Sequence, residues 1–337
     1  MKKLTSSMVD LMMSYYNNKI ILVTGGTGSI GSEIVKKILE FKPAAVRVLD
    51  NNETALFDLE QELNDNRIRT LIGDIRDYER LKMAFDDVDI IFHAAALKHV
   101  SICEYNPFDA VKTNVLGTQN VLNAALDANV EKVVVISTDK SVNPINVMGA
   151  TKLLAERLTI SANNYNGNKR TVFSCVRFGN VIDSRGSVVP IFKKQIKNGG
   201  PVTITDSEMT RFVMGIPEAV ELILKAGILA KGKEIFILKM PALNIIDLAE
   251  VMIEEFASTY NHKAEDIKIK IIGKRNGEKM YEELMTEDEL SYALETEELF
   301  ILNSDKKNDS NNAFNNHSHL SPKLSKEEIK NIILKFL

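Results

Sequence analysis

Cysteine is scarce in this chain, which has two, Cys103 and Cys175, among 337 residues. Two cysteines provide no disulfide framework, and the default compartment for such a chain is the reducing cytoplasm. Clusters of cysteine and histidine are also lacking, and the spacing of His93 and His99 is not that of a metal site. We therefore expect a cytoplasmic protein without a bound metal.

Excess positive charge and long hydrophobic runs are absent as well. The chain has 42 Lys and Arg against 46 Asp and Glu, a formal net charge of −4, so we expect no nucleic-acid partner. The apolar runs have the length of strands, short of the ~20 residues that an integral membrane segment needs. No signal-peptide core with a small-residue cleavage site is found at the N-terminus. With 45% hydrophobic residues, the composition favours a soluble enzyme with one large or two modest domains.

A glycine-rich turn is the most informative motif that is present. Gly25, Gly28 and Gly31 follow the apolar run 20–23 and precede the amphipathic stretch 33–40. In a strand–turn–helix unit such a turn lets the backbone approach a pyrophosphate, and the N–H groups at the helix start face the phosphates. The flanking strand and helix favour dinucleotide binding over a purely structural turn.

Asp50 ends the next apolar strand, about twenty residues after the glycine turn. A carboxylate at this position hydrogen-bonds the adenosine 2′-hydroxyl and repels a 2′-phosphate. The sequence therefore favours NAD as the cofactor, with NADP as the alternative.

Strand-like and helix-like segments alternate from residue 20 onward. This alternation predicts an α/β fold, a Rossmann-type doubly wound parallel sheet with helices on both faces. After residue 180 the pattern is less regular, which predicts a smaller C-terminal substrate lobe. The strand-like runs are 20–23, 46–49, 70–72, 90–93, 132–137 and 172–176.

We accordingly divide the chain into two domains. Residues 1–178 form the dinucleotide-binding domain, and residues 179–337 form mainly the substrate lobe, with some chain returning to the first domain. The stretch 5–18 predicts an amphipathic helix that packs on the domain or on a second subunit, with Met8, Leu11, Met12 and Tyr15 on one face. The polar stretch 303–323 predicts a loop.

Groups capable of proton transfer follow the fifth strand-like run. Thr138, Asp139 and Lys140 come directly after this run, and Met148 and Lys152 follow on a predicted helix. Ligands bind at the carboxyl ends of parallel strands. A carboxyl beside an ammonium transfers protons when burial tunes the two pKa values. The alternative for Asp139 and Lys140 is a surface ion pair or a helix cap.

A series of short motifs recurs along the chain, at 24–31, 93–100, 104–107, 137–140, 143–144, 149–152, 177–181, 186–190, 209–212 and 273–278. Together they resemble those of the extended short-chain dehydrogenases, and in particular the UDP-N-acetylglucosamine 4,6-dehydratases of surface-polysaccharide and glycan biosynthesis. The superfamily usually carries Tyr-x-x-x-Lys on the helix after the fifth strand. Here Met148 stands in the tyrosine position before Lys152, which is similar to the capsule-type branch of this family.

The resemblance implies a reaction cycle on UDP-N-acetylglucosamine. The C4 hydroxyl is oxidised, water is eliminated across C5 and C6, and hydride returns to C6, giving a UDP-4-keto-6-deoxy sugar. The resemblance also implies that Lys140 takes the C5 proton, Asp139 protonates the departing C6 hydroxyl, Thr138 hydrogen-bonds O4 and Lys152 orients the nicotinamide ribose. A thioether is a weak acceptor, so Asp139, or a water held by Thr138 and Lys152, is the candidate acceptor of the O4 proton.

The resemblance further assigns residues to each ligand. Cofactor residues are Gly25, Thr27, Gly28, Ser29, Ile30, Gly31, Asp50, Asp74, Ile75, Ala94, Ala95, Ala96, Lys98, Asn114 and Lys152. Substrate residues are Lys98, Asn180, Arg185, Val189, Thr205, Arg211, Arg275 and Glu278. Guanidinium groups match phosphate oxygens in bidentate geometry, so the three arginines are the expected diphosphate ligands. We also expect a homo-oligomer.

Two other functions are compatible with these motifs. A UDP-sugar 4-epimerase would stop at the C4 redox step, but the pair Asp139 and Lys140 favours elimination. A nucleotide-binding protein that has lost catalysis would explain Met148. Against this second alternative, the chain retains Thr138, Asp139, Lys140 and Lys152.

Overall fold

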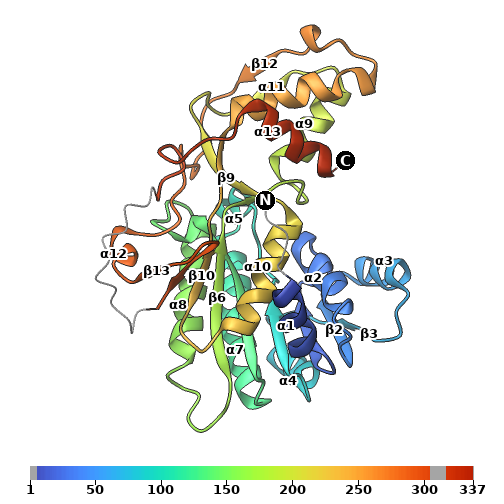
Figure 1. The fold of residues 1–337 in the computed structure, drawn as a ribbon, viewed down its shortest axis with the longest axis vertical. Helices are drawn as coiled ribbons and strands as arrows, with labels where there is room; N and C mark the ends of the chain where they lie inside the picture. Colours follow the sequence, from blue (N-terminus) through green and yellow to red (C-terminus); the bar gives the residue numbers. More distant parts are fainter. Residues whose placement is uncertain (1–5, 304–315, 337) are drawn as a thin grey trace.

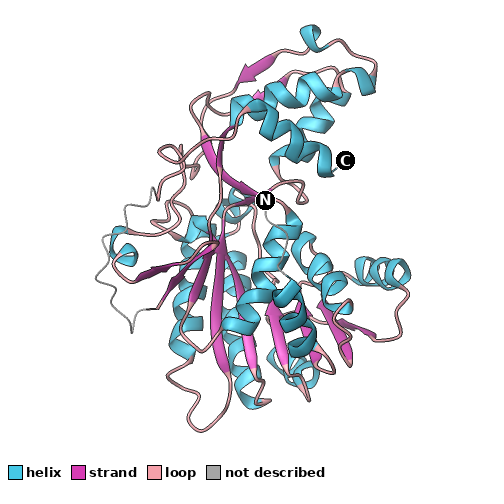
Figure 2. Cartoon of the chain, viewed as in Figure 1, coloured by secondary structure: helices cyan, strands magenta, loops and turns pink. Residues whose placement is uncertain are grey.

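The computed structural model describes residues 6–303 and 316–336. Residue 5 of the expected N-terminal helix and residues 304–315 of the expected loop lie outside the described residues. The described chain forms a large sheet covered by helices and a smaller lobe beyond one end of its strands (Figures 1 and 2).

The main sheet has nine strands in the order β13-β14-β10-β6-β5-β4-β1-β2-β3. Neighbours from β10 to β3 are parallel, whereas β14 is antiparallel to both β10 and β13. This order confirms the Rossmann-type doubly wound sheet predicted from the alternation of elements. The strands are β1 (Ile20–Thr24), β2 (Ala45–Asp50), β3 (Ile68–Ile72), β4 (Ile90–His93), β5 (Lys132–Thr138), β6 (Val172–Phe178), β10 (Ile235–Leu238), β13 (Ala293–Glu295) and β14 (Leu299–Leu302).

Burial on both faces explains why the central strands are apolar runs rather than alternating patterns. Val133, Val134 and Val135 are consecutive in β5, and all three are fully buried. Each predicted strand-like run forms a strand, and most strands extend one or two residues beyond the run. The extension arises because backbone pairing continues past the last apolar side chain.

Helices cover both faces of the sheet (Figure 1). One face carries α1 (Ser6–Tyr16), α2 (Ser29–Leu39) and α10 (Ile216–Leu229), and the other carries α4 (Tyr78–Phe85), α7 (Thr118–Asp127) and α8 (Val147–Ala162). α3 (Glu53–Leu63) packs near β3. Between β4 and α7 the chain forms α5 (Val100–Tyr105), α6 (Pro107–Ala110) and the π-helical turn η1 (Val111–Gly117).

The N-terminal helix packs on the sheet domain through Met8, Met12 and Tyr15 of the expected face, with Tyr16 added and Leu11 left out. Met12 and Tyr16 are fully buried, and the Tyr16 hydroxyl donates to the Leu224 carbonyl of α10 at 2.6 Å. Leu11, which we placed on the buried face, is 44% exposed. Residues four apart share a helix face, so the pair of residues 12 and 16 sets the buried side.

The smaller lobe has its own hydrophobic core, to which Phe192, Leu248 and Phe256 contribute. The expected division at residue 178 falls at the end of β6, while α10, β10, β13 and β14 return to the main sheet. The lobe contains β7 (Asn180–Val181), α9 (Val188–Lys197), β8 (Val202–Ile204), β9 (Thr210–Met214), β11 (Ala242–Asn244), α11 (Ile245–Phe256), β12 (Ile269–Ile271) and α13 (Lys326–Ile333). Shorter elements of the lobe are η3 (Ser258–Tyr260), η4 (Ala264–Asp266) and η5 (Leu334–Phe336), whereas α12 (Glu287–Leu290) lies beside β13 of the main sheet (Figure 1).

Candidate active site

The glycine turn between β1 and α2 has a conformation that requires glycine. Gly25 has a φ of 65°, and a Cβ on it would lie 2.6 Å from the Ala95 backbone nitrogen. A Cβ on Gly31 would lie 2.1 Å from the Gly25 carbonyl oxygen. A Cβ on Gly28, the N-cap of α2, would meet the Gly25 carbonyl oxygen at 3.1 Å and otherwise point into open space. The start of α2 is therefore accessible to an anionic ligand.

Asp50, at the end of β2, fastens this turn. Its Oδ2 accepts hydrogen bonds from the backbone N–H (3.1 Å) and the hydroxyl (2.7 Å) of Thr27. Its Oδ1 accepts one from the Asn52 N–H at 3.1 Å. The carboxylate that the sequence assigns to a ribose thus also fixes the shape of the turn.

A cleft of about 630 Å³, the turn cleft, opens over the glycine turn. It lies at the carboxyl ends of the strands, where the strand order reverses and where doubly wound folds bind dinucleotides. Most of the residues predicted for the cofactor line it: Gly25, Thr27, Gly28, Ser29, Ile30, Gly31, Asp50, Asp74, Ile75, Ala94, Ala95, Ala96 and Lys98.

Two predicted cofactor residues do not line the turn cleft: Lys152 lines the neighbouring strand-end cleft, and Asn114 is buried in η1. Its side chain accepts from the Leu97 N–H (2.8 Å) and donates to the Leu97 carbonyl (2.9 Å) and the Thr151 hydroxyl (3.0 Å). Asn114 therefore positions the loop after β4 instead of facing a ligand directly.

Two arginines line the turn cleft. We expected Arg185 at a substrate diphosphate, but its N–H donates to the Ser29 hydroxyl (2.9 Å) and its guanidinium donates to the Thr27 carbonyl. The sequence did not single out Arg76, whose hydrogen bonds to Asp74 hold the pKa of that carboxyl below its usual value. A cation therefore lies close to the predicted ribose site.

A second cleft of about 280 Å³, the strand-end cleft, brings together Thr138, Lys140, Met148 and Lys152. It is continuous with the turn cleft through shared lining residues such as Lys98. The residues that the sequence placed at the end of β5 and on α8 therefore meet at one point. Asp139 is not among the residues that line this cleft.

Asp139 lies behind the cleft wall, in the 3₁₀ turn η2 (Asp139–Ser141), with no exposed surface. Its Oδ1 accepts from the Thr138 hydroxyl (2.9 Å) and from Lys140 Nζ (2.9 Å). Its Oδ2 has no hydrogen-bond partner among the described residues. Thr138 and Lys140, which line the strand-end cleft, both contact Asp139, and the role at the C6 hydroxyl that the resemblance implied for Asp139 stays a prediction.

The η2 turn is held by a buried network behind it. The Ser141 hydroxyl donates to Glu156 Oε1 at 2.9 Å, and Arg177 donates to both oxygens of Glu156 at 3.1 and 2.8 Å. Burial opposes the charge of Arg177, but Glu156 and Glu289 outweigh it and raise the pKa of Arg177. Removal of one member of such a network leaves an uncompensated buried charge, so its members hold one another in place. Because Ser141 joins η2 to this network, we interpret the network as the support of the η2 turn.

Lys152 and Met148 complete the wall of the strand-end cleft. Lys152 Nζ donates to the Ile136 carbonyl at 2.5 Å, and burial lowers the pKa of this lysine although Glu156 opposes the shift. Met148 is 3% exposed and packs with Cys103 and Ala110. The side chain in the tyrosine position therefore forms an apolar wall and offers no proton-transfer group.

A third cleft of about 300 Å³, the interlobe cleft, lies between the sheet and the lobe. Lys140 and Asn180 line both this cleft and the strand-end cleft, and Asn180 Oδ1 accepts from Lys140 Nζ at 3.1 Å. The interlobe cleft contains the predicted substrate residues Asn180, Thr205, Arg211, Arg275 and Glu278. Val189 is instead buried in the lobe core, and its neighbour Val188 lines the cleft.

The two arginines of the interlobe cleft differ in what they contact. Arg211 is 5% exposed and donates to the carbonyls of Thr210 (2.7 Å), Lys279 (2.8 Å) and Met280 (3.2 Å), so it fixes the loop opposite. Arg275 is exposed on that loop, and its backbone N–H donates to Glu278 at 3.2 Å. The side chain of Arg275 is thus better placed than that of Arg211 for an incoming phosphate.

Two residues of the site were missed at the level of sequence. Glu282 is buried, lines the interlobe cleft and lies 3.4 Å from Lys140 Nζ. His99 lines all three clefts. The motif at 273–278 ends four residues before Glu282, and no periodicity separates Glu282 from the adjacent Glu283.

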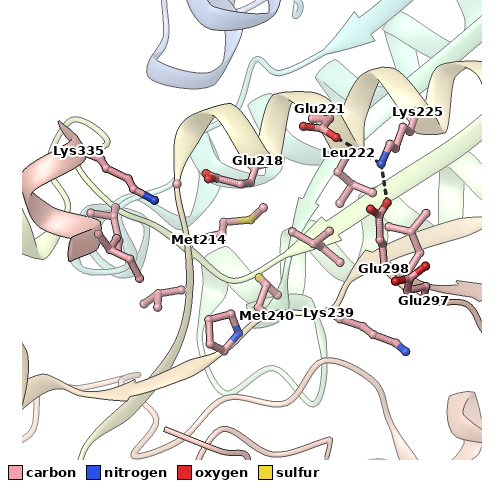
Figure 3. A pocket seen from close by; sticks show the side chains of 17 residues that line it. Met214, Glu218, Glu221, Leu222, Lys225, Lys239, Met240, Glu297, Glu298 and Lys335 are labelled. Atoms are coloured by element: carbon pink, nitrogen blue, oxygen red, sulfur yellow. Dashed lines mark hydrogen bonds and ion pairs between the residues drawn. The ribbon is translucent and has the colours of Figure 1, made fainter. Parts of the chain in front are cut away.

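A fourth cavity, of about 370 Å³, is lined by α10, the segment 238–241 and the start of β14 (Figure 3). Met214, Leu222 and Met240 contribute apolar surface, and Lys225 forms ion pairs with Glu221 (3.3 Å) and Glu298 (2.5 Å). None of its lining residues belongs to the predicted site.

Neither a metal cluster nor a membrane span is found in the described part of the chain. No group of three or more His, Cys, Asp or Glu residues within 6–303 and 316–336 is arranged to hold a metal ion. His93, the most buried histidine, hydrogen-bonds Thr24 (2.7 Å) and Thr118 (3.1 Å), and burial with the nearby Lys152 lowers its pKa to about 3. No helix in the same residues has the length and apolarity needed to cross a bilayer.

Residues 21–304 match the family described as polysaccharide biosynthesis protein. An uncharacterized membrane protein of Methanocaldococcus jannaschii is 61% identical over 95% of this chain and 96% of its own length. A UDP-N-acetylglucosamine 4,6-dehydratase (inverting) of Campylobacter jejuni is 43% identical over 85% of this chain and 83% of its own. A UDP-glucose 4-epimerase of Rickettsia bellii is 42% identical over 82% and 80%.

The solved structure of Pen from Bacillus thuringiensis is similar over nearly the whole chain. It is 48% identical, with a TM-score of 0.91, and the match covers 95% of this chain and 98% of that one. This chain and the solved structure of Pen therefore share the same fold.

Proposed function

Because this chain belongs to the polysaccharide biosynthesis protein family, we propose that it is a nucleotide-sugar 4,6-dehydratase that acts on UDP-N-acetylglucosamine. The observation that carries this proposal is the position of Lys140, which lines both the strand-end cleft and the interlobe cleft. A proton-transfer group there faces a sugar in one cleft and a nicotinamide in the other. An epimerase eliminates no water, so its reaction needs no group that removes the C5 proton.

The residues of the turn cleft fit NAD. The helix start at Gly28 is open to a pyrophosphate, and Asp50 stands at the strand end where a ribose hydroxyl is bound. NAD held there would supply the hydride acceptor for oxidation at C4 and the hydride donor for reduction at C6. Lys98 lines both the turn cleft and the strand-end cleft, and Lys152 lines the strand-end cleft, where we assign the nicotinamide ribose.

Thr138 and Asp139 are assigned to the O4 proton. Thr138 lines the strand-end cleft and donates to Asp139, so its hydroxyl passes a proton inward when O4 gives one up. Asp139 accepts that proton in place of the missing tyrosine. This assignment keeps one of the two acceptors considered from the sequence and explains how a buried carboxylate reaches O4.

Lys140 is assigned to the C5 proton. Once C4 is a ketone the C5 proton is acidic, and a base in hydrogen-bond reach removes it. Lys140 Nζ is oriented by Asp139 and Asn180 toward the junction of the two clefts. Arg275, Glu278 and Thr205 in the interlobe cleft are assigned to the UDP group.

Incubation of the purified protein with NAD and UDP-N-acetylglucosamine tests the proposal. We expect a product lighter by one water, with a C6 methyl group in its NMR spectrum. A product of unchanged mass would favour the 4-epimerase, a candidate kept because relatives such as the Rickettsia protein bear that name. Absence of turnover would favour a non-catalytic nucleotide-binding protein.

Substitution Asp50→Asn tests the cofactor preference. We expect the wild type to bind NAD more tightly than NADP, because the carboxylate hydrogen-bonds the 2′-hydroxyl and repels a 2′-phosphate. Asparagine still accepts from Thr27 but loses the charge. The dissociation constant for NADP divided by that for NAD should therefore fall by about tenfold to a hundredfold. Calorimetric titration measures both constants. Tighter binding of NADP by the wild type would reverse the assignment and point to Arg76.

Substitution Met148→Ala tests whether the tyrosine position takes part in the chemistry. We expect substantial turnover to survive, since no proton passes through the thioether. Met148→Leu, which conserves volume, is the matched control for the cavity that alanine leaves in the packing with Cys103 and Ala110. A loss greater than about a thousandfold in kcat with both variants folded would assign this site a catalytic role.

The expected homo-oligomer remains a prediction, and the exposed apolar side chains of α5, α6 and α8 are its expected contact surface. Tyr105 and Phe108 are 87% and 81% exposed, and Leu154 of the adjoining α8 is 51% exposed. Phe108→Lys should shift the sedimentation mass toward that of a single chain, because contiguous exposed apolar groups mark interfaces. Phe57→Lys, on α3, is the control. An unchanged mass in Phe108→Lys would exclude this surface.

The cytoplasmic location also remains a prediction.

A further inference from the structure

Resting on the proposed function, which assigns Lys152 to the nicotinamide ribose, we propose that Glu156 is a positioning residue that joins this cofactor lysine to the η2 turn. Glu156 follows Lys152 by four residues on α8, and it contacts Ser141 of η2, next to Lys140. It is 1% exposed and lines none of the three clefts, so it acts through the two lysines and not on a ligand.

The spacing on α8 places Glu156 on the same side of the helix as Lys152. Residues four apart share a helix face, and both side chains are buried where α8 packs on β5 and β6. Lys152 Nζ donates to the Ile136 carbonyl at the end of β5. A carboxylate therefore accompanies this lysine on the buried side of the helix.

Burial opposes the charge of Lys152, and Glu156 opposes the effect of burial. Burial lowers the pKa of Lys152, and the negative charge of Glu156 is the largest effect that raises it. The ammonium form carries three N–H donors and a full charge, so it is the form best suited to hold ribose hydroxyls. Glu156 therefore favours the form of Lys152 that binds the cofactor.

The other titratable groups around the cofactor lysine do not replace Glu156. Cys175 on β6 would act in the same direction as a thiolate, but burial raises the pKa of its thiol. His93 on β4 is neutral, because burial and the nearby ammonium lower its pKa to about 3. Lys98 and Lys140, which also line the strand-end cleft, carry positive charge when ionised.

The remaining contacts of Glu156 fix its place. Arg177 of β6 donates to Oε1 at 3.1 Å and to Oε2 at 2.8 Å, and the Ser141 hydroxyl donates to Oε1 at 2.9 Å. The same hydroxyl lies 2.7 Å from the carbonyl oxygen that ends β5. Because these donors come from two other elements, they hold the η2 turn, with Lys140, against the helix that carries Lys152.

Substitution Glu156→Gln removes the charge and keeps the shape. The amide oxygen still accepts from Ser141 or Arg177, but the pKa of Lys152 should fall further. The ammonium is present below this pKa, so NAD affinity is lost as the pH rises through it. That loss should begin at least about one pH unit lower in the variant than in the wild type. Calorimetric titration from about pH 6 to about pH 10 measures the dissociation constant, which should rise about tenfold to a hundredfold across the transition.

Glu289→Gln is the matched control for charge. Glu289 also pairs with Arg177, at 2.8 Å, but it is not among the groups that shift the pKa of Lys152. This variant should leave the pH dependence of NAD binding unchanged.

Ser141→Ala tests the link to the η2 turn. It removes one contact between η2 and Glu156 and leaves the carboxylate beside Lys152. The pH dependence of NAD binding should stay as in the wild type, whereas kcat for dehydration should fall about tenfold to a hundredfold because the turn that carries Lys140 is less well fixed.

A thermal melt shows whether each variant is folded. If Glu156→Gln does not fold, the double variant Glu156→Leu with Arg177→Met takes its place. It removes both charges of the buried pair together, a replacement that is often neutral for stability, and it should lower the pH of the NAD transition in the same way.

An unchanged pH dependence of NAD binding in the folded Glu156 variant would overturn the proposal. So would an equal shift in Glu289→Gln, which would indicate a general effect of charge, or wild-type kcat in Ser141→Ala. A wild type that binds NAD with the expected pH dependence but does not dehydrate UDP-N-acetylglucosamine would instead refute the proposed function, and the role of Glu156 toward Lys152 would stand.

Discussion

Replacement of Lys140 by alanine should stop dehydration while C4 oxidation continues. Removal of a positioned general base costs about a hundredfold to ten-thousandfold in rate, and no other described lysine lines both the strand-end and interlobe clefts. On addition of UDP-N-acetylglucosamine, the absorbance of reduced nicotinamide should rise and persist. Exchange of the C5 proton for deuterium should be slow, because the base that removes this proton is missing.

The control for Lys140→Ala has to separate catalysis from charge balance. Alanine leaves Asp139 and Glu282 without the cation between them, so a thermal melt should accompany the assay. Lys270→Ala, which removes an exposed lysine on β12, should leave turnover unchanged. Wild-type rates in folded Lys140→Ala would refute the dehydratase mechanism.

Replacement of Asp139 by asparagine should prevent the reaction at its first step. If Asp139 accepts the O4 proton through Thr138, asparagine cannot take it, and reduced nicotinamide should not accumulate. We expect a loss of about a hundredfold to ten-thousandfold in the rate of C4 oxidation, measured in a single turnover. Thr138→Val removes the hydroxyl that links Asp139 to the cleft and should give the same result.

The two strand-end variants are therefore informative as a pair. Lys140→Ala should show reduction without elimination, and Asp139→Asn should show neither. Accumulation of reduced nicotinamide in Asp139→Asn would mean that another group, such as a water held by Thr138 and Lys152, accepts the O4 proton. Cofactor binding should survive in both, because neither residue is among those that line the turn cleft.

Local patterns in the sequence were sufficient for the fold and the turn cleft. Apolar runs bounded by polar residues predicted six strands of the main sheet. A strand covered by helices on both faces of the sheet carries apolar side chains on both faces, so it is recognisable as a continuous apolar run. The glycine turn and Asp50 lie next to each other through the pairing of β1 with β2. Their roles follow from short-range backbone geometry, and a consecutive stretch of sequence encodes that geometry.

Long-range packing decided the rest of the site. Asp139 and Lys140 are adjacent in the sequence, yet the η2 turn buries the first and exposes the second to two clefts. Val189 and Asn114 face the interior because of the orientation of α9 and η1, which their own sequences do not specify.

The sequence by itself determined the sheet, the dinucleotide turn and the identity of the strand-end groups, because each depends on neighbours along the chain. Only the tertiary structure brought Glu282, from the loop between β12 and α12, to Lys140 at the end of β5. In a loop no helical or strand period relates a residue's position to the direction of its side chain. The pairing of these two charges therefore depends on how the lobe packs against the sheet, and it was visible only in three dimensions.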